Sequence, residues 1–294
     1  MASLLDMRRR IKSVKNTQQI TKAMKMVAAA KLKRATDRVT AARPFAVKMT
    51  EVLSGLSTRI GDDFSHPLLD ARGDEKYLLV FVTADKGLCG GFNTNLMKTA
   101  QNFLRENAGK QTEMIPIGRK GRDFFKRRQM TIVEEYVGLT GGGRVEHNDA
   151  LAIAGRIIKT FTEDETLDKV FIVFTEFKSV IAQEIRVRQL LPIPRLENQE
   201  TETPTSGAQA EYIYEQPASE IFGRLLPKQV ETQVYRAMLE SVASEQGARM
   251  TAMDSASKNA GELIDTLTLN MNRIRQAAIT KEIIEVVSGA AAAA

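Results

Sequence analysis

The sequence has no tryptophan, one cysteine and two histidines, and aromatic residues make up only 6% of its 294 residues. The single Cys89 cannot form an intramolecular disulfide, which suits a reducing compartment. His66 and His147 lie far apart without a Cys or His neighbour at metal-ligand spacing, so we expect both in loops or at helix ends. No window approaches eighteen consecutive apolar residues, so any membrane role is expected to be peripheral.

Patterns typical of catalysis are also missing. No Ser-His-Asp, Cys-His or paired-carboxylate arrangement is legible, and we predict no catalytic residue, cofactor, metal ion or small-molecule substrate. The loop TADKGLCGGFNTN, residues 83–95, resembles a phosphate-binding turn, but Gly87, Gly90 and Gly91 match neither established nucleotide-binding spacing. A tight turn is the favoured interpretation, and a nucleotide-dependent enzyme stays open as an alternative.

What the sequence does contain is a strongly basic beginning. Residues 1–60 hold fourteen Lys or Arg against three acids, a net +11, whereas the whole chain carries only +6. The stretch ITKAMKMVAAAKLKRA, residues 20–35, has no acidic residue at all. Nucleic acid, an anionic membrane surface and an acidic protein partner are the candidate ligands for such a helix, and composition does not choose among them.

The basic segment also carries a heptad pattern, which predicts one long helix from about Ser3 to Ser57, roughly 80 Å at 1.5 Å per residue. Where Gln18, Thr21 and Lys25 interrupt the apolar seam, we expect Ile20, Met24 and Val27 to supply apolar groups. The seam positions are Leu4, Met7, Ile11, Val14, Gln18, Thr21, Lys25, Ala28, Leu32, Ala35, Val39, Ala42, Ala46, Met49, Leu53, Leu56 and Ile60.

A second heptad pattern occupies the other end of the chain, from Met253 to about Val287, and the helix is expected to reach back to about Gln229. Pro227 fits either the first turn of this helix or a kink in a helix that begins near Pro217. Two rods at opposite ends predict an antiparallel coiled coil. Its seam is rich in Ala, Ser, Gly and Met, which allows close approach but buries little apolar area.

Between the rods the period changes to that of strands. The apolar run YLLVFVT, residues 77–83, is typical of a strand covered on both faces, and further strands are expected at 114–117, 131–137, 170–175 and 182–191. Helices are expected at 95–106, 118–128 and 148–161. The alternation indicates an α/β fold with a central Rossmann-like domain of residues 75–195. The polar run from Arg195 to Ala210 is interpreted as a loop.

A second basic cluster, GRKGRDFFKRR at residues 118–128, falls on one of the expected helices. It lacks the aromatic pattern of a single-strand binder, and we expect Phe124 and Phe125 to pack inward. A solvated helix surface is the favoured interpretation of its charges.

Four stretches together resemble the gamma subunit family of F-type ATP synthases. These are IKSVKNTQQITKAMKMVAAAKLKRA near the start, TADKGLCGGFN, SEQGARMTAM, and RIRQAAITKEIIEVVSGAAA at the end. The resemblance covers essentially the whole chain in order. It implies a central-stalk rotor that transmits torque between the proton-driven c-ring and the nucleotide sites of the alpha and beta subunits, performs no bond chemistry, and also contacts the epsilon subunit.

The resemblance also implies contact residues and a location. Lys22, Met24 and Lys25 match the positions that face an acidic lever of the beta subunit, and the other partner contacts implied are Arg249, Arg275, Gln276, Thr280, Tyr212 and Tyr214. The tyrosines belong to a foot near the c-ring, and the apolar end of residues 286–294 suits a bearing. The implied location is the cytoplasmic side of the cell inner membrane, peripheral and held through the ATP synthase complex.

The predicted organisation is a coiled-coil helix in 1–60, the α/β domain in 75–195, a connector in 196–216 and the second coiled-coil helix in 217–294. Two competing hypotheses remain beside the rotor. A nucleic-acid-binding coiled coil predicts duplex binding that weakens steeply with salt. A nucleotide-dependent enzyme predicts saturable binding of ATP or NAD.

Overall fold

The computed structural model describes residues 4–60, 64–194 and 216–293, and divides the chain into two compact units. One unit combines Met1–Ala29 with Arg249–Ala294, and the other is Ala30–Ala248. Two long helices, α1 (Leu4–Ile60) and α5 (Ala218–Ala293), each contribute to both units. The α/β class with long terminal helices is thereby confirmed. Pro227 lies inside α5, so the helix that begins near Pro217 is the correct alternative.

Helix α1 buries the face that its heptad pattern predicted. Met7, Ala28 and Val39 are at most 6% exposed, and Leu56 is fully buried. The prediction that Ile20, Met24 and Val27 supply the apolar groups at the polar part of the seam was partly wrong, because Ile20 is 59% and Val27 56% exposed. Polar groups fill that part of the seam themselves, as the following contacts show.

Within the first unit, α1 and α5 pair in antiparallel fashion. Lys25 contacts Asp254, whereas Gln18, earlier in α1, donates through Nε2 to the carbonyl of Ser257, later in α5, at 3.3 Å. The Thr21 hydroxyl donates to the Gln18 carbonyl at 3.0 Å and is only 9% exposed. Because these polar side chains find partners inside the pair, the seam has no need of Ile20 or Val27.

The second unit contains a mixed four-stranded sheet in the order β2-β1-β3-β4. Its strands are β1 (Lys76–Val82), β2 (Gln111–Ile117), β3 (Lys169–Phe177) and β4 (Gln183–Leu191). β1 is parallel to β2 and β3, and β4 runs antiparallel to β3. Phe81 of β1 stands opposite both Pro116 and Val173, which fixes the register of the central strand.

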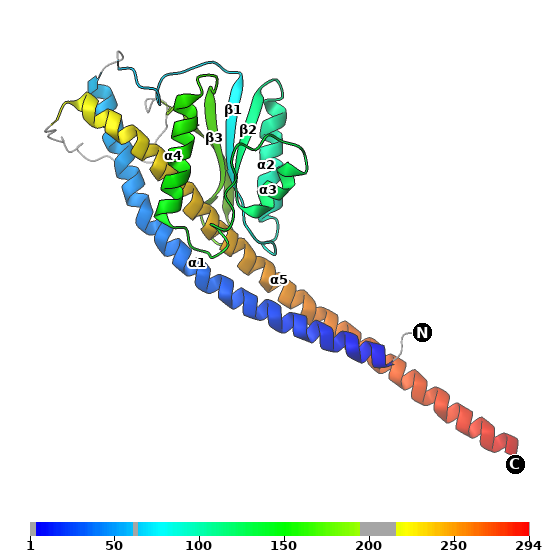
Figure 1. Ribbon diagram of the computed structural model, residues 1–294. Coiled ribbons are helices and arrows are strands. Elements are labelled where there is room, and N and C mark those ends of the chain that lie inside the picture. The colour runs from blue at the N-terminus through cyan, green and yellow to red at the C-terminus, as the bar shows by residue number, and fades with distance from the viewer. Residues whose placement is uncertain (1–3, 61–63, 195–215, 294) are drawn as a thin grey trace. The chain divides into compact units, whose positions relative to one another are not determined.

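Helices cover both faces of this sheet, as the continuous apolar run of residues 77–83 predicted. α2 (Phe92–Glu106) and α3 (Arg119–Lys126) lie on one side, and α4 (His147–Glu163) lies on the other (Figure 1). The side of α2 and α3 holds a cluster that includes Leu79, Phe81, Leu96 and Phe125. Phe125 is 1% exposed, so its inward packing is confirmed.

Residues 131–137 form no regular strand, contrary to the sequence pattern. They follow the outer edge of β2 and make only two isolated parallel bridges, Met114 with Ile132 and Ile117 with Tyr136. Val133 and Val137, on one face, are each 37% exposed, and Ile132, Glu134 and Tyr136 on the other face are only half-buried, so neither face of the segment is fully buried. Without a buried face, nothing holds the chain in the extended alternation of a strand, and it serves instead to cover the sheet edge.

The small-residue part of α5 packs against the sheet as well as being part of a helix pair. Residues 237–247 are all buried, including the polar Ser241 and Ser244. β3 extends beyond its pairing with β1, and there the Thr175 N–H donates to Ser241 Oγ at 3.2 Å while Ser244 Oγ donates to the Thr175 carbonyl at 3.3 Å. Short side chains let the helix approach near enough to replace a missing strand partner.

Candidate functional site

The predicted contact residues of α1 lie on a basic, mostly exposed surface. Lys22 is exposed and Met24 is half-buried, while neighbouring Met26 is 62% exposed. Lys22 makes no ion pair with any residue that the structure describes, so its charge is available to a partner. An exposed cation next to exposed apolar groups is a surface suited to an acidic protein segment.

Lys25 differs from Lys22 because it is already paired across the two helices. Its Nζ lies 2.6 Å from Asp254, which also contacts Lys258 at 3.1 Å. The hydrogen bond from Lys25, with that from Lys258, lowers the pKa of Asp254 below its ordinary value. The side chain of Lys25 is 43% exposed, so it can contact a partner while it keeps this pair.

The predicted contacts on α5 lie on solvent-facing positions of the same unit. Arg275, Gln276 and Thr280 are exposed, and Arg249 is half-buried. Thr280 donates through Oγ1 to the carbonyl of Gln276 at 3.0 Å, which holds its side chain against its own helix. Tyr212 and Tyr214 lie outside the described residues.

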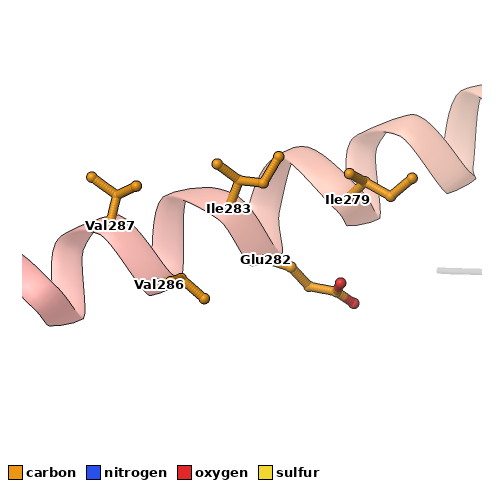
Figure 2. Close-up of a pocket in the computed structure, with 5 residues that line it drawn as sticks. All are labelled: Ile279, Glu282, Ile283, Val286 and Val287. Atoms are coloured by element: carbon orange, nitrogen blue, oxygen red, sulfur yellow. The ribbon is translucent and has the colours of Figure 1, made fainter.

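The end of α5 exposes an apolar surface. Ile279, Ile283 and Val287, spaced four residues apart, point to one side of the helix (Figure 2) and are 48%, 58% and 61% exposed. Val286 is 71% exposed and lies on another side beside Glu282. Exposed apolar side chains in such number mark a surface that a partner covers.

The Gly-rich turn after β1 is held by a carboxylate of the chain itself. Asp85 Oδ1 accepts from the N–H groups of Arg119 and Gly138 at 3.0 and 2.8 Å, and Oδ2 accepts from the Thr140 N–H and hydroxyl and the Gly141 N–H at 2.9 to 3.1 Å. Burial alone would raise the pKa of Asp85, but these hydrogen bonds outweigh it and lower the pKa.

This arrangement bears on the nucleotide hypothesis. The N–H of Arg119 at the start of α3, with loop amides beyond β2, is the kind of donor set that binds phosphate in nucleotide-binding folds. Here Asp85 already satisfies those donors. Gly118, at φ 105°, brings its backbone so near Thr83 that a Cβ would lie 2.1 Å from the Thr83 carbonyl oxygen. These amides therefore bind the chain's own Asp85 rather than a phosphate, and Gly118 serves close packing against Thr83.

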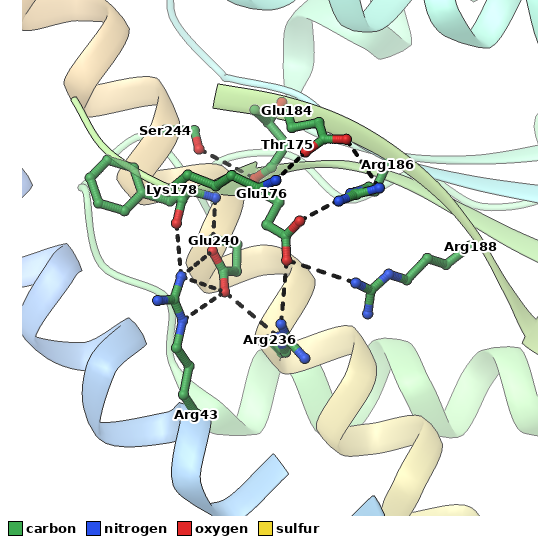
Figure 3. A network of polar contacts seen from close by, with 11 residues as sticks. Arg43, Thr175, Glu176, Lys178, Glu184, Arg186, Arg188, Arg236, Glu240 and Ser244 are labelled. Carbon is green, nitrogen blue, oxygen red and sulfur yellow. Dashed lines mark hydrogen bonds and ion pairs between the residues drawn. The ribbon is translucent and has the colours of Figure 1, made fainter. Parts of the chain in front are cut away.

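A network of charged side chains around the buried Glu240 joins α1, α5 and the sheet within the second unit (Figure 3). Glu240 of α5 is fully buried and receives hydrogen bonds from Arg43 at 3.2 Å and from the Phe177 N–H at 2.8 Å. Arg43 also donates to the Phe177 carbonyl at 2.7 Å. Arg236 lies 3.6 Å from Glu240 and 3.5 Å from Glu176 of β3, so it links the two carboxylates.

Sequence reasoning missed both Asp85 and this network. In the sequence Arg43 is one more charge of the basic segment 1–60, and no pattern singles out Glu240. The one available signal is that Glu240 lies within the small-residue run of α5. A solvent-exposed helix face usually carries several charged residues, and this run carries few, which is more typical of a buried face.

Neither a metal centre nor a membrane span is present among the described residues. No group of three or more His, Cys, Asp or Glu side chains could hold a metal ion there. His66 accepts a hydrogen bond from the Leu68 N–H through Nδ1, and His147 begins α4, as the expected loop and helix-end positions required. Nor does any helix in the described ranges combine the length and apolar composition needed to cross a bilayer.

Comparison with known proteins connects these surfaces to a family. The family model described as ATP synthase matches residues 3–293. The ATP synthase gamma chain of Solibacter usitatus is 52% identical over 296 residues, with 100% of both chains covered. That of Geotalea daltonii is 51% identical and covers 99% of this chain and 98% of its own. This chain belongs to the ATP synthase gamma chain family.

Solved structures agree with the membership in this gamma chain family. A chain of the Tetrahymena thermophila mitochondrial ATP synthase central stalk and c-ring structure is 29% identical, with a TM-score of 0.62 over 81% of this chain and 99% of its own. A chain of the Euglena gracilis mitochondrial ATP synthase structure shares the fold at 21% identity, with a TM-score of 0.67 over 98% of this chain and 94% of its own.

Proposed function

We propose that this gamma-family chain is the central-stalk rotor of an ATP synthase, transmitting torque between the c-ring and the nucleotide sites of the alpha and beta subunits without bond chemistry of its own. The observation that carries the proposal is the first unit, in which paired helices present an exposed basic surface on α1 and an exposed apolar end on α5. The epsilon subunit is a further proposed partner.

The chemistry of the basic surface suits a contact that must form and break in every turn. An exposed ion pair contributes about 0 to 1 kcal/mol, so each contact with an acidic lever of the beta subunit is weak by itself. Lys22, Met24 and Lys25 on α1 and Arg249, Arg275, Gln276 and Thr280 on α5 are the proposed contacts. Tyr212 and Tyr214 remain proposed contacts of the foot.

The apolar end of α5 is proposed to turn inside the ring of alpha and beta subunits. Beyond Lys281, Glu282 and Glu285 the helix carries no further charged side chain, so its last part has no charged side chain to desolvate during rotation. Through these partners, the proposed location of the chain is the cytoplasmic side of the cell inner membrane. The ranges 1–60, 75–195, 196–216 and 217–294 remain the proposed functional division of the chain.

Reconstitution of the complex with and without this chain tests the proposal. Inverted membrane vesicles that contain the whole complex are expected to couple ATP hydrolysis to proton uptake, and vesicles assembled without the chain are expected to lose that coupling. Proton uptake is followed with a pH-sensitive dye and hydrolysis by phosphate release. Undiminished coupling in a complex that lacks the chain would rule the rotor role out.

Met24→Lys is expected to lower coupling efficiency. The substitution adds a cation between Lys22 and Lys25 and strengthens attraction to an acidic lever by up to about 1 kcal/mol, which slows release up to about fivefold. The measurement is the ratio of protons transported to ATP hydrolysed. Val47→Lys adds the same charge at an exposed apolar position of α1 that lies in the second unit, away from the proposed contacts, and serves as the control. Equal coupling in both variants and the unaltered protein would remove Met24 from the contact.

A further inference from the structure

The basic cluster of residues 118–128 is not used by the proposed function, and it borders a groove. The groove lies between α2 and α3 on the outer side of the second unit and encloses about 470 Å³. Three cations line it: Lys98 and Arg105 of α2, and Arg128, which follows α3. Its apolar part is formed by Leu104, Phe125 and Met130. No acidic side chain belongs to the lining.

Charge around the groove is unbalanced. Residues 92–130 contain nine Lys or Arg against three acids, and two of these acids are engaged, Asp123 by Arg122 and Glu113 by Lys76. The three lining cations, Lys98, Arg105 and Arg128, make no ion pair with any described residue. An anionic partner would therefore find cations that need not first leave a carboxylate.

Two of the lining cations are held in place before any partner arrives. The Arg128 guanidinium stacks 3.7 Å from the centre of the Phe124 ring and donates to the Phe124 carbonyl at 3.3 Å. Arg105 donates to the side-chain oxygen of Asn102, one turn earlier on α2. Fixed side chains lose less conformational entropy when they bind, so the groove is organised for recognition.

We propose that this groove docks an acidic amphipathic segment of another protein, with carboxylates on the three cations and an apolar side chain on Leu104 and Met130. The pattern of cations around an apolar floor is complementary to such a segment. Nucleic acid fits less well, because Phe125 is 1% exposed and Phe124 is covered by Arg128, which leaves no ring for a base to stack on. A membrane fits less well, because Leu104 and Met130 are half-buried rather than protruding.

The experiment measures binding of a fluorescent helical peptide built of Glu, Leu and Ala to the full-length chain at physiological ionic strength. Lys98→Glu with Arg105→Glu is expected to weaken binding at least tenfold, since two cations proposed to bind the peptide's carboxylates become anions that repel them. The matched control, Lys126→Glu with Arg127→Glu, makes the same charge change just outside the groove and is expected to change the affinity by less than about threefold.

Two further probes decide which chemistry the groove recognises. A peptide in which Ala replaces every Leu is expected to bind about tenfold more weakly or worse, because the apolar floor loses its partner. Circular dichroism establishes that both double variants remain folded. Equal loss in the two double variants, or equal binding of the peptide without Leu, would overturn the proposal. Tighter binding of a DNA duplex or of anionic vesicles than of the peptide would also overturn it.

Discussion

Glu240→Ala is expected to lower the free energy of unfolding by about 3 kcal/mol, towards the lower end of what breaking a buried charge pair costs. The substitution removes the carboxylate that Arg43, Arg236 and the Phe177 N–H share. Arg43 is 43% exposed and regains some hydration, which keeps the cost below the upper end. Phe177 N–H stays buried without an acceptor, and that part of the cost has no relief.

Two readouts follow this change. The urea midpoint by circular dichroism reports the loss of stability, and amide hydrogen exchange at Phe177 reports whether the loss arises at the network. Glu240→Gln keeps one acceptor for the Phe177 N–H and is expected to lie between the alanine variant and the unaltered protein. Glu220→Ala, which removes an exposed pair with Arg224, is the control and is expected to cost less than about 0.5 kcal/mol. An unchanged midpoint with unchanged protection of Phe177 in Glu240→Ala would contradict the role given to the network.

Asp85→Asn is expected to destabilise the α/β domain by about 3 kcal/mol, because hydrogen bonds to a charged acceptor contribute about 1.5 to 3 kcal/mol each. The new side-chain NH₂ group would point its N–H donors at backbone N–H groups that now donate hydrogen bonds to Asp85, and two donors repel each other. Only one oxygen remains to serve five donors. Thermal unfolding followed by circular dichroism measures the change, and Glu106→Gln, at an exposed position, is the control and is expected to have little effect.

The loss of stability in Asp85→Asn is also expected to depend on pH, and the direction of that dependence follows from the pKa of Asp85. Because the pKa of Asp85 is lower in the folded protein than its ordinary value, the carboxylate stabilises the fold fully above about pH 5. That contribution is lost as the pH falls through the lowered pKa. The stability difference between the unaltered protein and Asp85→Asn is therefore expected to be constant near neutrality and to narrow in acid. A difference that widens in acid would mean that Asp85 is not the charged acceptor described here.

The seam of α1 was predictable because its cause is local in sequence. Met7, Ile11, Ala28, Leu32 and Val39 follow a regular spacing, and a long helix can bury such a face only against a partner. The strands β1 and β3 were predictable for a similar reason, since a short apolar run of this kind needs cover on both faces. Local pattern and tertiary environment agree at these positions.

The failures have an equally physical cause. Residues 131–137 have the composition of a strand, but a strand also needs a face to bury, and this segment lies on a sheet edge with both valines partly exposed. Ile20 and Val27 were expected in the seam, yet Gln18 and Thr21 occupy it through hydrogen bonds that only the partner helix and the helix's own carbonyls provide. A rule based on the spacing of apolar residues takes no account of hydrogen-bond acceptors on another helix or strand.

The sequence by itself determined the two terminal helices, the α/β class and the surplus of basic charge on the first helix, because periodicity and composition act through neighbours along the chain. Tertiary structure alone decided which charges are buried and with what. Glu240 meets Arg43 and Phe177, and Asp85 meets amides at the start of α3 and in the loop of residues 138–141, only after segments far apart in sequence have been brought together. A carboxylate in the interior is stable only with its donors in place, and their positions are a property of the fold rather than of any stretch of residues.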